Sequence, residues 1–75
     1  MTTLRYNLRE DAMVNLTIYD MMGRQVSTLV SSEQSAGYKS VQWNAVNDAG
    51  APVSAGLYLY RIRTGKFVKT HKMIL

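Results

Sequence analysis

The side chains that could bind a metal ion or support catalysis are few, and most of them lie in turn-like segments. Asp20, Asn47 and Asp48 offer oxygen atoms of the kind that calcium prefers. They lack the alternate spacing and the closing glutamate of a calcium-binding loop. Aspartate and asparagine in turns are typical of side chains that bond to the nearby backbone. We therefore predict no metal site and no cofactor.

The sequence also lacks the combinations of residues from which a catalytic centre is built. His71 is the only histidine, and without a nearby acidic residue it cannot complete a triad or a histidine metal cluster. Glu10 and Asp11 are adjacent, which is a poor arrangement for a pair of acid/base carboxylates. The absence of cysteine excludes a thiolate nucleophile and a disulfide. We predict that the chain is not an enzyme and that His71 is a surface or edge residue.

Length and composition indicate one small folded domain over residues 1–75. The chain is 47% hydrophobic, which is too apolar for a disordered segment. It contains no apolar run long enough to span a membrane and no signal peptide. If the protein is secreted or reaches the cell surface through the periplasm, we expect the export signal on a longer precursor.

Positive charge is concentrated near the C-terminus. The net charge is +4, and five of the nine basic residues lie in the last fifteen positions: Arg61, Arg63, Lys66, Lys69 and Lys72. Such a segment can attract nucleic acid, anionic lipid or acidic polysaccharide. Nucleic-acid-binding domains usually cluster more charge, and lysines also keep an exposed edge hairpin soluble and unpaired. We favour the edge hairpin and expect no nucleic-acid partner.

The elements that must position these residues are β-strands, because apolar residues recur with period two and no long helical pattern is present. Strands with one buried face are expected at 4–8 and 14–19. Others are expected at 25–30 (with Val26 and Leu29 inward), 38–43, 57–64, 67–75 and, as a short piece, near Val53. The polar segment 31–37 is expected to be a loop. The pattern predicts an all-β fold, a small Ig-like antiparallel β-sandwich of about seven strands.

One stretch, WNAVNDAGAPVSAGLYLYRI, has the composition of an elaborate turn followed by an apolar strand. Trp43 ends a strand and is expected to be buried between the two sheets. Residues 47–50 fit a turn in which glycine supplies a positive φ angle. In the strand that follows, Tyr58, Tyr60 and Ile62 share one face.

Four segments carry a family resemblance: TTLRYNL, VNLTIYDMMGRQVSTLV, SAGYKSVQWNAVNDAGAPVSAGLYLYRI and KTHKMIL. Together they resemble the C-terminal sorting domain of type IX (Por) secretion substrates, and they are similar to the FlgD-type Ig-like domain with which that family overlaps. The resemblance assigns structural motif positions to Gly23, Trp43, Gly50, Gly56 and Tyr58. It implies partner recognition by a terminal strand that contains Lys72, Met73, Ile74 and Leu75.

Three alternative functions are considered, none of them enzymatic: the first two follow from the resemblance, and the third from the frequent association of small β-sandwiches with polysaccharide-degrading enzymes. The leading hypothesis is a sorting and anchoring domain that the outer-membrane secretion machinery recognises at the end of a larger secreted protein. The alternative is a FlgD-like structural domain, of the kind that acts in the flagellar hook cap, which self-assembles or caps a filament through strand-edge contacts. A third hypothesis, a carbohydrate-binding module, needs a row of exposed aromatic rings. Among Tyr19, Tyr38 and Tyr60, strand alternation leaves only Tyr19 clearly outward.

Overall fold

The computed structural model describes residues 2–75, which fold into six β-strands. These are β1 (Thr2–Leu8), β2 (Ala12–Asp20), β3 (Gln25–Gln34), β4 (Gly37–Trp43), β5 (Leu57–Thr64) and β6 (Phe67–Ile74). No helix within this range is long and apolar enough to cross a membrane. The predicted all-β class is confirmed, with six strands in place of about seven.

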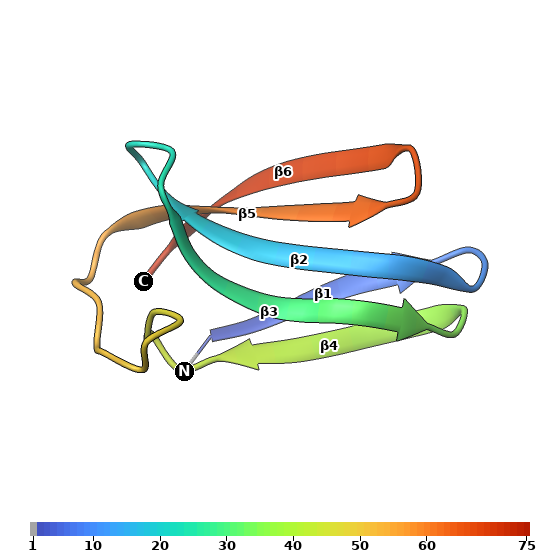
Figure 1. The fold of residues 1–75 in the computed structure, drawn as a ribbon, viewed down its shortest axis with the longest axis horizontal. Helices are drawn as coiled ribbons and strands as arrows, with labels where there is room; N and C mark the ends of the chain where they lie inside the picture. The colour runs from blue at the N-terminus through green and yellow to red at the C-terminus, as the bar shows by residue number, and fades with distance from the viewer. Residues whose placement is uncertain (1) are drawn as a thin grey trace.

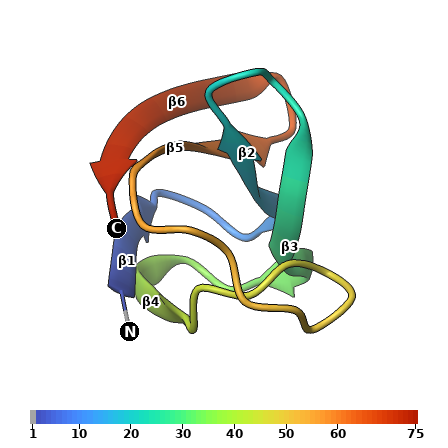
Figure 2. The ribbon, with the colours of Figure 1, turned by 90° about the vertical axis from the view of Figure 1, so that its left-hand side faces the viewer.

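The strands form two antiparallel sheets that pack as a sandwich. The smaller sheet pairs β1 with β4, and the larger has the order β3-β2-β5-β6 (Figure 1). Figure 2 shows the larger sheet curving over the smaller one, with β3 beside β4 and the end of β6 above β1. The curvature follows from the right-handed twist of strands. The two layers are unequal in width, since four strands face two.

The core lies between the sheets and is centred on β2. Val14, Leu16 and Ile18 alternate along β2 and are almost fully buried, as is Trp43 from β4. Each of the three aliphatic side chains contributes roughly 1.5–3 kcal/mol by leaving water. The expected alternation in β1 is also confirmed, because Leu4 and Leu8 are buried.

Two expectations about the strands are wrong. The segment expected to be a loop at 31–37 is strand as far as Gln34, because β2 continues to Ala12 and offers the polar residues of β3 a pairing partner. No strand forms near Val53. Pro52 has no N–H with which to extend a ladder, and the segment makes only an isolated bridge between Pro52 and Val46.

The irregular pattern of the third strand has a structural cause. The pairing of β3 with β2 skips Leu29 and Val26, so each is the extra residue of a β-bulge. A bulge shifts the inward face of a strand by one residue. Both side chains consequently pack against the core, as expected, although they are three positions apart.

Candidate interaction site

One side of the sandwich is closed by the long connection between β4 and β5, residues 44–56. Asp48 lies against the edge of β3, where its Oδ1 accepts a hydrogen bond from the Thr28 N–H (3.0 Å) and its own N–H donates to the Val26 carbonyl (3.0 Å). The bond from Thr28, together with one from the Gln25 side chain, lowers the pKa of the Asp48 carboxyl. These contacts occupy the edge of β3 at residues 26–28, so another strand cannot pair with this part of the edge.

The connection is held in shape by its own hydrogen bonds. Asn47 Oδ1 accepts from the backbone N–H groups of Ala49 (3.0 Å) and Ala51 (2.9 Å). Gly50 has a φ angle of 83°, which favours glycine. The predicted turn at 47–50 is confirmed. Asn47 and Asp48, two of the residues considered for calcium, use their oxygen atoms for bonds within and beside this turn.

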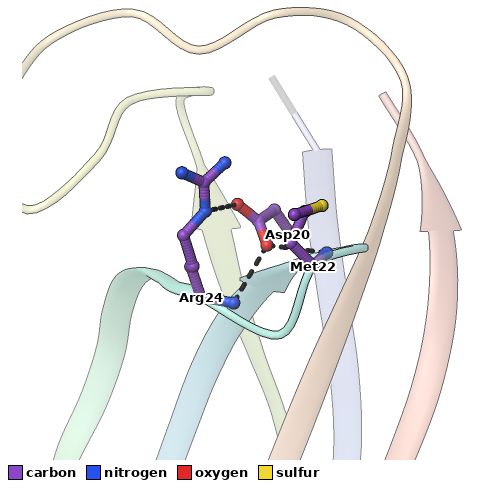
Figure 3. Close-up of polar contacts among 3 residues, drawn as sticks. All are labelled: Asp20, Met22 and Arg24. Atoms are coloured by element: carbon purple, nitrogen blue, oxygen red, sulfur yellow. Dashed lines mark hydrogen bonds and ion pairs between the residues drawn. The ribbon is translucent and has the colours of Figure 1, made fainter.

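The third of those residues, Asp20, fixes the turn between β2 and β3. Its Oδ1 accepts from the N–H groups of Met22 and Arg24 (2.9 Å each), and Arg24 Nε donates to Oδ2 at 2.9 Å (Figure 3). The bond from the Arg24 backbone is the main cause of the lowered pKa of Asp20. Gly23 completes the turn with a φ angle of 85°. Residues 2–75 contain no grouping of three acidic, histidine or cysteine side chains that could hold a metal ion.

Two aromatic residues of the family motif join the connection to the core. Trp43 and Tyr58 pack edge to face, with ring centroids 5.3 Å apart. Trp43 Nε1 donates to the Val46 carbonyl (2.9 Å), and the Tyr58 hydroxyl donates to the Ser54 carbonyl. The second bond has the form of the tyrosine corner of Ig-like domains. Gly56 exchanges two backbone hydrogen bonds with Leu75 (2.8 and 3.3 Å), which ties the end of the chain to the start of β5.

The opposite side of the sandwich is open. β1 pairs only with β4, and β6 pairs only with β5. Between β1 and the β5–β6 hairpin lies a groove of about 820 Å³. Buried apolar side chains line it: Leu4, Leu8, Leu16 and Ile62. Four cationic side chains, Arg5, Arg9, Lys66 and Lys69, also line it, together with one acidic side chain, Glu10.

β6 is the least covered strand of the larger sheet. Met73 is its only buried residue, and Phe67 at the other end is 58% exposed. His71 is exposed, as predicted, and its ring stacks on Tyr60 at 5.2 Å. The smaller sheet is too narrow to reach this part of β6. The strand is therefore anchored at its C-terminal end and uncovered toward the hairpin.

The four terminal residues assigned to partner recognition fall into two groups. Met73 is buried and Leu75 packs against the core, so both serve the fold of this chain. Lys72 and Ile74 are exposed on β6. A partner that touches this end of the chain meets only the second pair.

The free edge of β6 can be assigned residue by residue. Leu75 and Gly56 exchange hydrogen bonds, and bonded and non-bonded pairs alternate along an antiparallel ladder. Counting back through the register, Met73, His71 and Lys69 bond to β5. The N–H groups of the intervening residues point away from β5: Val68, Thr70, Lys72 and Ile74. These groups form the unpaired edge.

The sequence did not indicate the groove, because it is formed by β1 and β6 from opposite ends of the chain.

The expectation for the exposure of the tyrosine rings was also partly wrong. Tyr38 is the exposed ring, at 90%, because it lies on the outer face of the narrow sheet. Tyr19 faces outward but lies beneath Arg61, whose guanidinium carbon is 5.0 Å from the ring centroid. Tyr19, Tyr38 and Tyr60 therefore do not form an aromatic row.

Comparison with known proteins agrees with this fold. The FlgD Ig-like domain family matches residues 1–70. The crystal structure of FlgD from P. aeruginosa is similar, with a TM-score of 0.76 and 25% sequence identity over 96% of this chain and 57% of that chain. The chain thus spans a little over half the length of that protein. No curated protein matched the sequence. The FlgD part of the predicted resemblance is confirmed, whereas neither match shows a type IX sorting domain.

Proposed function

The chain belongs to the FlgD Ig-like domain family, and from this premise we propose that it is a structural, non-catalytic domain that contacts other protein chains through its unpaired strand edges. The observation that carries this proposal is the asymmetry of the sandwich. Asp48 occupies the edge of β3 at residues 26–28, whereas β1 and β6 both have an unpaired edge on the side that holds the groove. β4 likewise pairs only with β1. An unpaired edge is a template for strand addition from another chain.

A different chain fits this edge better than a second copy. β6 carries Lys69 and Lys72, and the hairpin turn carries Lys66. Edge pairing between two copies would bring these lysines together, which opposes association. The role that we infer is therefore joining or capping within an assembly, such as the hook cap implied by the FlgD resemblance, in preference to self-assembly.

Type IX sorting, a destination outside the cell and recognition by the outer-membrane machinery stay predictions. The terminal segment offers Lys72 and Ile74 to such a partner, because Met73 and Leu75 are used in the core. The family match supports the structural role more directly.

Selection from a random library of short peptides tests the proposed function, followed by amide hydrogen exchange with the strongest binder. We expect binding peptides to slow exchange at Thr70 and Val68 or within β1, and to leave Thr28 of β3 unchanged. Protection confined to β3 and the 44–56 connection would contradict the proposal. Failure to obtain any binding peptide would contradict it as well.

A further inference from the structure

The unequal widths of the two sheets leave a position for one more strand. Ig-like sandwiches of the constant type have four strands in one sheet and three in the other. Here the larger sheet has four and the smaller only two. The register of the β5–β6 hairpin places Phe67, Lys69 and His71 on the same face as Tyr60 and Ile62, which faces the smaller sheet. A third strand beside β1 would cover this face.

We propose that the groove between β1 and β6 receives a seventh β-strand from another protein chain, an extended segment in which apolar side chains alternate with acidic ones. The inference rests on the proposed role in strand-edge contacts and specifies the partner. β1 offers seven residues for pairing, which corresponds to about 23 Å of strand.

The apolar half of the pattern follows from the groove floor. Leu8, Leu16 and Ile62 lie at the bottom of the groove, flanked by the half-buried rings of Tyr6 and Tyr60. Alternate side chains of an added strand would point toward this floor. Over Leu8, Leu16 and Ile62, apolar side chains gain by leaving water, whereas charged ones would lose hydration without a partner. The exception is a position next to Lys69, which faces the groove from β6.

The acidic half follows from the charges around the groove. Thr3, Arg5 and Asn7 are the exposed, outward residues of β1, and they would lie beside the outward residues of an added strand. Lys66 and Lys69 add positive charge on the hairpin side, Lys69 from the face that looks into the groove, and Glu10 is the only acidic lining residue among the four cationic ones. Opposite charges on neighbouring strands attract, so the outward positions beside Arg5 favour glutamate or aspartate. The chain's own edge strands, β1 and β6, carry more basic than acidic residues, which argues against a second copy as the donor.

A titration monitored by NMR tests the inference. The probe is a blocked seven-residue peptide that alternates glutamate and valine, added to the isotope-labelled chain. We expect amide shifts in β1 and the β5–β6 hairpin, and none in the 44–56 connection. A peptide that alternates lysine and valine is the charge control and is expected not to bind.

Two charge reversals at exposed positions locate the contact. Arg5→Glu alters the groove and is expected to weaken binding about fivefold or more. Arg63→Glu makes the same change in net charge on a residue that does not line the groove, and is expected to leave the affinity unchanged. Equal effects of the two reversals would overturn the inference, as would equal binding of the acidic and basic peptides.

The two proposals fail in different ways. If library peptides protect the edges of β1 or β6 but the acidic peptide does not bind, the proposed function stands and the seventh-strand inference is wrong. If no library peptide binds, both are wrong.

Discussion

Two aspartate side chains support the fold through hydrogen bonds that favour the ionised carboxylate. Hydrogen bonds lower the pKa of Asp20 and Asp48 below their ordinary value of 3.8. Because the pKa in the folded state is the lower one, the stabilisation is present above the unfolded pKa and is lost as pH falls through the folded pKa. We expect the free energy of unfolding to decrease below about pH 4. In the double variant Asp20→Asn with Asp48→Asn, the free energy of unfolding should decrease less as the pH falls.

Urea unfolding followed by Trp43 fluorescence at several pH values measures this effect. The double variant Glu10→Gln with Glu33→Gln is a charge-matched control, because it also removes two carboxylates and alters neither turn. If the double asparagine variant kept the full acid-dependent loss of stability, these two carboxylates would not be its source.

The hydroxyl of Tyr58 has a separate structural role. Tyr58→Phe keeps the ring against Trp43 but leaves the Ser54 carbonyl without its partner. We expect a loss of about 1 kcal/mol in the free energy of unfolding. Tyr38→Phe makes the same chemical change on a ring that is 90% exposed, so it should have no effect. Equal losses in the two variants would show that the bond to Ser54 contributes nothing to stability.

At the scale of the element, the two edges of β6 predict opposite responses to proline. Thr70→Pro removes an N–H that points away from β5, and an edge strand tolerates this change. His71→Pro removes an N–H that bonds to β5 and should cost about 3 kcal/mol or more, enough to unfold much of a small domain. Circular dichroism and thermal unfolding of the two variants make the comparison. A folded His71→Pro with an unfolded Thr70→Pro would reverse our assignment of the edge.

The strands could be predicted where burial imposes alternation, as along β2, whose Val14, Leu16 and Ile18 face the core. The prediction was wrong where only the presence of a neighbouring strand decides whether a segment becomes a strand. Residues 31–34 are polar and look like a loop, yet they continue β3 because β2 lies beside them. The residues near Val53 look like a strand, but Pro52 has no N–H with which to extend a ladder and only an isolated bridge to Val46 forms. The composition of a segment does not show which other segment of the chain lies beside it in the fold.

At the scale of the whole molecule, the candidate site was beyond prediction for a related reason. The groove depends on how two sheets of unequal width overlap, and its walls come from β1 and β6. The resemblance pointed to the terminal residues Lys72, Met73, Ile74 and Leu75, none of which lines the groove, whereas Arg5 and the apolar floor were not predicted. The closing role of Asp48 was also missed, because its contact with Thr28 joins residues 20 positions apart.

Amide hydrogen exchange of the free chain at low concentration is the most direct test of a sandwich that is closed at β3 and open at β6. It compares two threonines on the two edge strands of the larger sheet. The Thr28 N–H is bonded to Asp48 at 3.0 Å, whereas the Thr70 N–H points away from β5. The structure predicts slow exchange at Thr28 and fast exchange at Thr70. Slow exchange at both amides would show that the β6 edge is already covered and would contradict a strand-edge role.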